Sequence, residues 1–345
     1  MEQYSAIGLS VAVVKNNKIV YTHSFGYKNK DEKKRLKNDN LFRIASISKS
    51  FSATSIMQLV EAGKLSLDDD FSKLVGFRVR NPKYPNVVIT LRMVLSHTSS
   101  INDNLGYFSF DVINPEKNPH FDSCYNEYKP GEGYMYCNLN FNMVGAVIEK
   151  ISGERFDQYV ARHILKPLKL YGGYCVDSLD QSRFVTLYEY DSATRAFTVA
   201  ENAYNPRREE LKNYFMGYST PALSPTGGMK ISATDLAKYM MMHMNYGEFK
   251  GTRIISETSA KQMQTAVSDP EHYGLALFAT EKYIPGKILK GHTGSAYGLY
   301  SNMFFSPEEK FGIVVITNGC NPIYSEGYCE LLLKSARLLY KNFIE

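Results

Sequence analysis

The sequence lacks the features that mark several large classes of protein. It has only five cysteines among 345 residues, widely spaced and with no Cys-x-x-Cys pair, so we expect neither a zinc site nor any other metal. No stretch approaches roughly 18 uninterrupted apolar residues, which excludes a predicted transmembrane helix. There are no internal repeats, no low-complexity segments and no Pro/Gly/Ser linker, so we predict a single domain over 1–345.

The chain also carries little excess charge. Its 40 basic and 35 acidic residues give a net charge of +5 and are interspersed, whereas a nucleic-acid-binding protein concentrates its cations on one face. The densest charged run, 28–37, follows a strand-like segment and is interpreted as a solvated loop rather than a patch for anionic partners. The composition therefore predicts no nucleic-acid partner.

The first residues give no sign of an export signal. Met1-Glu2-Gln3-Tyr4 leads almost at once into a strand-like run. We expect either a periplasmic or secreted protein, seen as a mature chain from which the signal has been removed, or alternatively a cytoplasmic one.

Strand patterns occur at both ends of the chain, and helical patterns lie mostly between them. Segments 7–14 and 18–25 flank Asn16-Asn17, which predicts a hairpin because asparagine tolerates positive φ. A second hairpin is expected over 184–200, and a helix over 46–62. The C-terminal part predicts strands at 273–278, 287–290, 300–305 and 312–317 and a helix at 324–343.

The fold class that these patterns predict is α/β (α+β). An antiparallel sheet from about 7–26 and 272–318 would be covered by the C-terminal helix and by the helix that begins at Ser46. The active site would occupy the cleft beside a mostly helical lobe. The predicted lobes are an α/β lobe of about 1–65 plus 228–345 and a helical lobe of about 66–227.

Ser46-Ile47-Ser48-Lys49 is the only Ser-x-x-Lys in the chain. Residues three apart share one face of a helix, so the Lys49 amine can lie near the Ser46 hydroxyl. A serine needs a base to become a nucleophile, and a buried lysine loses its proton more easily than an exposed one. A serine at a helix start followed by an exposed lysine is also common, and the tetrapeptide alone does not decide between these readings.

Tyr136-Cys137-Asn138 follows a turn-rich loop and precedes a predicted helix. In that place Tyr136 can direct its phenol into a cleft, and the Asn138 amide can both donate and accept hydrogen bonds. The alternative is an aromatic core residue followed by an asparagine that caps the helix.

His292-Thr293-Gly294-Ser295 lies on or beside an edge strand. Gly294 allows the backbone to approach a ligand closely, and the Ser295 N–H could complete an oxyanion hole. His292 could donate to a substrate carbonyl or carboxylate, with Thr293 beside it. The alternative is a strand end with a histidine whose hydrogen bonds are satisfied within the protein.

The order and spacing of these three motifs resemble those of the serine β-lactamase and penicillin-binding-protein superfamily, in the branch of class C β-lactamases, D,D-peptidases and esterases. The resemblance runs from about Gly8 to Asn318. Supporting stretches are Ile89-Thr90-Leu91-Arg92-Met93-Val94-Leu95-Ser96-His97-Thr98-Ser99, Pro225-Thr226-Gly227-Gly228 and Gly291-His292-Thr293-Gly294.

The resemblance implies a role for each matching residue. Ser46 would be the acylated nucleophile, Lys49 would take or relay its proton, and Tyr136 would act as base or as proton donor to the leaving group. Asn138 would orient Lys49 and the substrate. The third motif would bind substrate and complete the oxyanion hole, through His292, Thr293, Gly294 and Ser295. No cofactor is implied, and His97 is expected to be a packing or capping residue.

Two departures from the family pattern bear on the substrate. His292 stands where most β-lactamases have lysine, and the histidine version is found among D,D-peptidases of the family; it lowers the expectation of efficient β-lactam hydrolysis because histidine need not be charged at neutral pH. Cys137 replaces a small serine or alanine and is expected to be a small buried group.

The sequence is therefore compatible with three functions. The first is hydrolysis of a D-amino-acid peptide or a β-lactam through an acyl-enzyme, as in a D-alanyl-D-alanine carboxypeptidase or a β-lactamase. The second is hydrolysis of small acyl esters by the same groups. The third, of a different class, is a catalytically silent penicillin-binding or sensor module. The expected partner is a small molecule or peptide.

Overall fold

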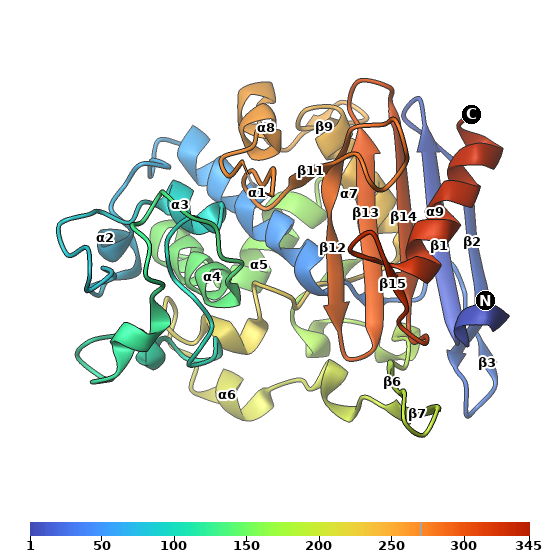
Figure 1. Cartoon of the computed structure of the whole chain (residues 1–345), viewed down its shortest axis with the longest axis horizontal. Helices are drawn as coiled ribbons and strands as arrows, with labels where there is room; N and C mark the ends of the chain where they lie inside the picture. Colours follow the sequence, from blue (N-terminus) through green and yellow to red (C-terminus); the bar gives the residue numbers. More distant parts are fainter. Residues whose placement is uncertain (270) are drawn as a thin grey trace.

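The structure, a computed structural model, describes residues 1–269 and 271–345. Its main feature is a seven-stranded sheet in the order β11-β12-β13-β14-β1-β2-β3, in which every neighbouring pair is antiparallel (Figure 1). The strands are Phe278–Thr280 (β11), Leu289–Ala296 (β12), Leu299–Ser306 (β13), Phe311–Thr317 (β14), Gly8–Lys15 (β1), Lys18–Asn29 (β2) and Lys34–Arg35 (β3).

The two ends of the chain meet in the middle of this sheet. β1 lies between β2 and β14, with Val11 opposite Val315 in the register. Asn16 and Asn17 both adopt positive φ, which is the backbone that a tight two-residue hairpin requires. The predicted antiparallel sheet built from both termini is confirmed.

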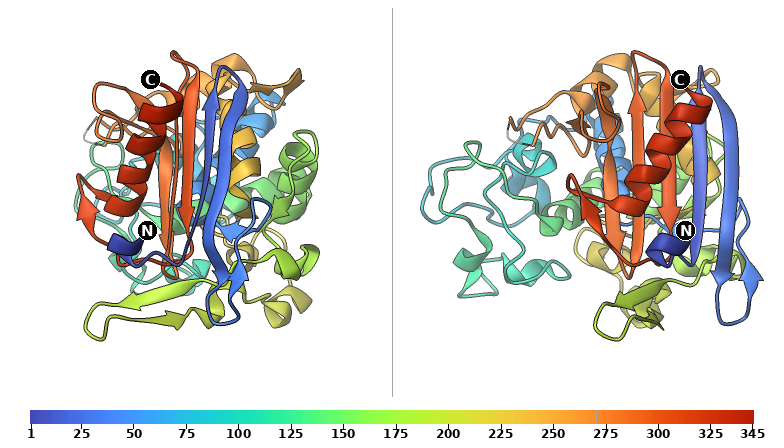
Figure 2. Two further views of the ribbon diagram at one scale, coloured as in Figure 1. Left: turned by 90° about the vertical axis from the view of Figure 1, so that its right-hand side faces the viewer. Right: turned by 45° about the vertical axis from the view of Figure 1, so that its right-hand side comes forward.

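Helices cover both faces of the sheet (Figure 2). α9, Glu330–Phe343, packs on β14 from one side, as predicted for the C-terminal helix. On the other side the helix in direct contact with β1, β13 and β14 is α7, Ala233–Met244. The expected cover for this face, the helix after Ser46, lies one layer deeper.

That helix is α1, Ser48–Glu61, and it is an interior element. It packs on α4, Asn138–Ser152, and its Phe51 ring stacks on Tyr239 of α7 at 3.7 Å between centroids. Its small hydroxyl residues are buried together with its apolar ones, and only its last residue, Glu61, is exposed. A helix buried all round cannot form an outer layer, which is why α7 takes that place.

The remaining elements are short. A small three-stranded sheet has the strand order β4-β8-β5, formed by Phe42–Arg43 (β4), Lys230–Ile231 (β8) and Gly172–Gly173 (β5). The other helices are α2 (Phe71–Val75), α3 (Leu91–Leu95), α5 (Phe156–Val160), α6 (Arg208–Lys212) and α8 (Glu257–Gln264). Three hairpins pair β6 (Tyr188–Asp191) with β7 (Ala196–Val199), β9 (Glu248–Phe249) with β10 (Thr252–Arg253), and β15 (Tyr324–Ser325) with β16 (Tyr328–Cys329).

Four predicted boundaries need correction. The strands expected at 273–278 and 287–290 are found at Phe278–Thr280 (β11) and Leu289–Ala296 (β12). The hairpin expected over 184–200 is confined to 188–199, because the chain at 183–185 bonds to Leu41 instead: the Leu41 N–H donates to the Arg183 carbonyl, and the Val185 N–H donates to the Leu41 carbonyl. The final helix starts at Glu330 rather than at 324, since the residues before it form the β15–β16 hairpin. Across the described residues, no helix has both the length and the apolar character needed to span a membrane.

Candidate active site

Ser46 lies in a sharp turn between β4 and α1. A 3-10 turn, Ala45–Ile47, precedes the helix, and Ala45 adopts a φ of 46°. A non-glycine residue in this region is strained and persists only where surrounding contacts hold it. The Ser301 hydroxyl supplies one such contact by donating to the Ile44 carbonyl at 2.9 Å. The turn places the Ser46 side chain at the start of the helix rather than along its side.

Lys49 follows one turn later and is completely buried. Its Nζ donates to Ser46 Oγ at 3.0 Å, to Asn138 Oδ1 at 2.8 Å and to the Thr226 carbonyl at 3.1 Å. Burial lowers the pKa of Lys49 to about 7, although the negative charge of Asp103 acts in the opposite direction. Near neutral pH the amine is therefore partly unprotonated and can accept a proton from the serine.

Asn138 is held on both sides of its amide. Its Oδ1 accepts from Lys49 and from the Thr226 hydroxyl, the latter at 2.8 Å. Its Nδ2 donates to Asp103 Oδ2 at 2.9 Å. This pairing assigns the amide orientation, because the Asp103 carboxylate can only accept, which requires the NH2 group of Asn138 on that side and its oxygen toward Lys49 and Thr226.

Asp103 is a member of the site that the sequence analysis did not identify. Besides Asn138 Nδ2, its carboxylate accepts from the backbone N–H of Asn138 at 2.8 Å and of Leu139 at 2.9 Å. These are the first N–H groups of α4, which Cys137, as the residue before the helix, cannot cap with its own side chain. The sequence analysis offered Asn138 as the cap of this helix, and no local pattern indicates a partner 35 residues away in sequence.

Tyr136 lies beside these groups, half-buried and with its phenol oxygen shielded from solvent. Its ring lies 4.7 Å from Lys49 Nζ and packs on the His97 ring at 4.4 Å between centroids. Burial raises the pKa of the phenol, and the nearby Ser46 hydroxyl acts in the opposite direction. Among the described residues the phenol oxygen has no hydrogen-bond partner of ordinary geometry. A free buried hydroxyl next to the serine can exchange a proton with a reacting group there.

His97 supports this ring, as expected for a packing histidine. It is completely buried at a positive φ of 60°, and its Nδ1 accepts from the Cys137 N–H at 3.1 Å. Cys137 is itself buried, as predicted. Burial lowers the pKa of His97 well below its ordinary range, so the ring is neutral.

A cavity of about 300 Å³ opens above Ser46. Its described walls carry four tyrosine and phenylalanine rings and a single carboxylate, and they include the whole third motif. The lining residues are Ser46, Tyr134, Tyr136, Glu271, Tyr273, Phe278, His292, Thr293, Gly294 and Ser295. Ser46, Tyr136 and the third motif, which are distant in sequence, therefore share one cavity, while Lys49 and Asn138 lie behind it.

β12 carries the third motif along this cavity. β11 pairs with β12 only as far as Gly291, so the backbone of Thr293 and Ser295 has no strand partner on that side among the described residues. Gly294 faces the turn before Ser46, where a Cβ would come within 3.0 Å of the Ile44 carbonyl oxygen. This close approach brings an unpaired strand edge to the serine, which suits backbone binding of a substrate.

His292 is neutral in this setting. Burial and the charge of Lys49 lower its pKa to about 3. Its Nδ1 lies 2.5 Å from the Thr293 carbonyl, which can only accept, so Nδ1 carries the proton and Nε2 accepts from the Tyr273 hydroxyl at 3.0 Å. His292 therefore brings no positive charge to the cavity. Within the described residues, no three His, Cys, Asp or Glu side chains gather in a group that could hold a metal.

Comparison with known proteins agrees with this arrangement. The model of the beta-lactamase family matches residues 1–336. Protein flp of Staphylococcus aureus strain MW2 is 24% identical over 328 residues, which are 90% of this chain and 59% of that protein. The chain thus spans less than two thirds of this curated relative's length.

Solved structures show the same fold. A penicillin-binding protein homologue from Pyrococcus abyssi superposes with a TM-score of 0.78 at 28% identity, covering 99% of this chain and 75% of that one. A D-amino acid amidase from Ochrobactrum anthropi superposes with a TM-score of 0.74 at 19% identity, covering 97% and 94% of the two chains. With the family match over nearly its whole length, this chain belongs to the beta-lactamase family of the serine β-lactamase and penicillin-binding-protein superfamily.

Proposed function

We propose that the protein is a serine hydrolase that forms an acyl-enzyme on Ser46. The observation that carries this proposal is the hydrogen bond from the buried Lys49 amine to the Ser46 hydroxyl, made by a lysine whose pKa lies at about 7. Membership of a family of hydrolases is consistent with it. A nucleophile paired with a base of matched pKa is the minimum requirement for acyl transfer.

In the first step Ser46 Oγ attacks the substrate carbonyl while its proton passes to neutral Lys49. Tyr136 then supplies the proton that the departing amine or alcohol takes up, with Lys49 returning a proton to the phenol, and the C–N or C–O bond breaks. In the second step water attacks the ester carbonyl and gives a proton to the same pair of residues. The pair returns this proton to Ser46 Oγ as the bond between the carbonyl carbon and Oγ breaks, which restores the serine and releases the acid. The backbone N–H groups of Ser46 and Ser295 would hold the oxyanion in both steps.

The charged groups that line the cavity affect which substrate charge it can accept. The described lining contains the Glu271 carboxylate and a neutral His292, and no lysine or arginine. Lys49 lies behind the cavity, where its amine is hydrogen-bonded to Ser46, Asn138 and Thr226. A free carboxylate on the substrate would find no counter-charge there and would face Glu271. Within the class of D-amino-acid peptides and β-lactams, this favours uncharged amides over substrates with a terminal carboxylate.

The same observation favours a second candidate function, hydrolysis of small acyl esters. An uncharged ester meets no electrostatic penalty in this cavity, and its aromatic walls can pack on an apolar acyl or alkyl group. The amidase and esterase functions use the same groups and differ only in the leaving group.

The test is intact-protein mass spectrometry after exposure to a fluorophosphonate, together with rates on nitrocefin, a D-Ala-D-Ala peptide, a D-amino acid amide and a p-nitrophenyl ester. We expect an adduct that maps to Ser46, and loss of labelling and of turnover by about 10⁴-fold or more in Ser46→Ala. Retained turnover in that variant would place the nucleophile elsewhere. The absence of any adduct in the wild type would favour the silent binding module.

A further inference from the structure

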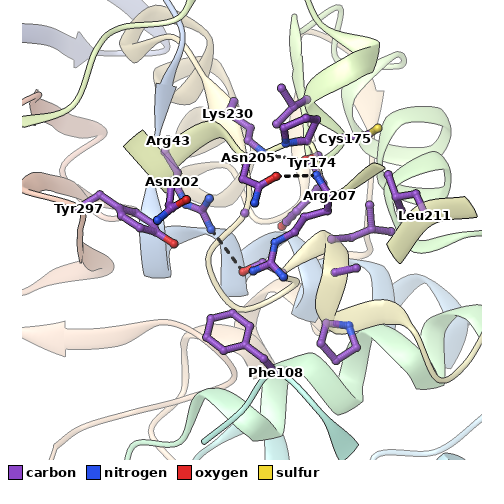
Figure 3. Close-up of a pocket in the computed structure, with 17 residues that line it drawn as sticks. Arg43, Phe108, Tyr174, Cys175, Asn202, Asn205, Arg207, Leu211, Lys230 and Tyr297 are labelled. Atoms are coloured by element: carbon purple, nitrogen blue, oxygen red, sulfur yellow. Dashed lines mark hydrogen bonds between the residues drawn. The ribbon is translucent and has the colours of Figure 1, made fainter. Parts of the chain in front are cut away.

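A second pocket, with an internal volume of about 30 Å³, shares no lining residue with the catalytic cavity (Figure 3). Arg43, Arg207 and Lys230 gather around it, together with aromatic and small polar residues. None of the described residues that line it is an aspartate or a glutamate. The pocket is therefore cationic on its inner surface without an acidic residue of its own.

Two of the cations occupy directly opposite positions in one small sheet. Arg43 of β4 and Lys230 of β8 are partners in the antiparallel register. Like charges at such positions repel each other, and the low dielectric of a buried site strengthens the repulsion. Lys230 is only 3% exposed, so water does little to screen the pair. Burial, together with the Arg43 guanidinium, holds the pKa of Lys230 well below its ordinary value, so the ammonium form is disfavoured in the empty pocket. A negative group placed between or beside the two side chains would stabilise that form.

The hydrogen bonds of this pair leave its charge uncompensated. Lys230 Nζ donates to the Tyr174 carbonyl, and Arg43 donates to the carbonyls of Gly227 at 3.1 Å and Ala203 at 2.9 Å. These acceptors are dipoles and not full charges. The carboxylate that acts on Lys230 from outside the pocket, Asp157, accepts on both of its oxygens from Nε and Nη2 of Arg155.

Arg207 adds a third cation from a strained backbone position. Its φ is 53°, and the Asn205 side chain holds this turn by accepting from the Arg207 N–H at 3.0 Å. The guanidinium lies 5.6 Å from the Phe108 ring and spends one nitrogen on Glu210 at 3.0 Å. Its remaining N–H groups are available to a ligand.

We propose that this pocket binds an oxyanion, the phosphate or carboxylate group of a small molecule. Such a group accepts charge-assisted hydrogen bonds from guanidinium and ammonium groups together and removes the repulsion between Arg43 and Lys230. The volume suits one small anionic group. The site is distinct from the acyl-transfer site and does not depend on the proposed hydrolase activity.

The pocket is connected to the catalytic residues through Arg43. Arg43 precedes Ser46 by three residues in the chain. Its Nε donates to Gly227, the neighbour of Thr226, whose carbonyl accepts from Lys49. An anion on Arg43 would therefore be separated from the catalytic lysine by two directly bonded residues.

The experiment is isothermal titration of the full chain at low ionic strength with inorganic phosphate and, in a separate arm, with succinate. We expect saturable one-to-one binding in at least one arm, which also identifies the class of oxyanion. Lys230→Met and Arg207→Met should each weaken binding by about tenfold or more, the loss expected for one charge-assisted contact. The matched control is Lys64→Met, which removes one charge from an exposed lysine outside the pocket and should change binding less than about twofold.

The folding of each variant is checked by its thermal melting before titration. Arg207 is partly exposed, so Arg207→Met keeps the test valid should Lys230→Met not fold. Failure of the wild type to bind either anion saturably would overturn the proposal. Binding in folded Arg207→Met at the wild-type affinity, or an equal loss in Lys64→Met, would overturn it as well.

Discussion

The protonation state of Lys49 is the residue-level property on which the proposed mechanism depends most. Burial lowers its pKa from 10.5 to about 7, and only the neutral amine can take the serine proton. We expect kcat/KM for an uncharged p-nitrophenyl ester to fall about tenfold per pH unit below this pKa and to level off above it. A rate that stays constant from pH 5 to 8 would show that Lys49 is not the base.

The same shift has a consequence for stability. The folded state holds this proton less tightly than the unfolded state, so between about pH 7 and 10.5 the unfolded chain binds more protons. Lys49 therefore lowers the free energy of unfolding most at and below neutral pH, and this cost shrinks as the pH rises through that window.

Asp103 is a positioning residue, because it acts on Lys49 through Asn138 and through its charge. Asp103→Asn keeps the size of the side chain but removes the charge that raises the pKa of Lys49. We expect the acid limb of the pH–rate profile to move to lower pH, and kcat to fall about 10- to 100-fold as Asn138 loses its charged acceptor. The measurement is the full pH profile of kcat/KM.

The control for this variant is Asp122→Asn, a change of the same kind at an exposed aspartate. It should leave both the profile and kcat in place. A loss of rate in Asp103→Asn without any movement of the profile would assign Asp103 a role in capping α4 alone.

The site residues that could be predicted from the sequence are those that lie close together in the chain or belong to a recognisable motif. Ser46 and Lys49 are three apart, and helical geometry alone brings them together. Asp103 and Thr226 contact the same network from loops with no regular spacing, and their partners depend on how the chain returns. From the sequence the charge of His292 at neutral pH is open. Its burial in the folded protein lowers its pKa and makes the ring neutral.

At the level of elements, the contact between β12 and the turn before α1 determines where the third motif lies. A Cβ on Gly294 would come within 3.0 Å of the Ile44 carbonyl oxygen and of Ser301 Oγ. We expect Gly294→Ala to force the strand away from Ser46, lowering kcat/KM by about 100-fold and the free energy of unfolding by about 1–3 kcal/mol. Kinetics and chemical denaturation of the same preparation measure both effects.

Gly173→Ala is the matched control, because this strand glycine has its nearest neighbour at an ordinary 3.7 Å. It should retain both rate and stability. Full activity in Gly294→Ala would mean that the two elements can separate without cost to the site.

The apolar spacing in the sequence could not predict which helix packs directly on the sheet. α1 and α7 both carry apolar residues at helical spacing, and nothing local distinguishes a helix that lies on a sheet from one that lies behind it. The distinction arises from the buried hydroxyl residues of α1, which find partners on other elements: Ser52 donates to the Pro225 carbonyl and Thr54 lies 3.0 Å from the Tyr239 hydroxyl.

At the level of the whole molecule, the buried Glu149 carboxylate connects α4 to segments that follow it in the chain. Glu149 accepts from the Phe156 N–H at 2.8 Å, the Gly217 N–H at 2.6 Å and the Thr220 hydroxyl at 2.9 Å, and from the Tyr214 hydroxyl. Glu149→Gln would place an amide donor against donors. We expect the free energy of unfolding to fall by about 2–4 kcal/mol, measured by chemical denaturation.

Glu209→Gln serves as the control, because it makes the same change at an exposed glutamate that pairs with Lys212 on the surface. Its effect should stay within about 0.5 kcal/mol. Equal stability of Glu149→Gln and the wild type would show that the four hydrogen bonds add nothing beyond what a neutral amide supplies.

The sequence by itself determined the antiparallel sheet from both termini, the helix that carries Ser46 and Lys49, and the family, because alternation, helical spacing and motif order are properties of the chain alone. Tertiary structure alone decided which helix covers the sheet, that Asp103 completes the Lys49–Asn138 network, and that Arg43 and Lys230 face each other. Those relations join residues far apart in sequence, and burial, which sets the pKa of Lys49 and His292, exists only once the chain has folded.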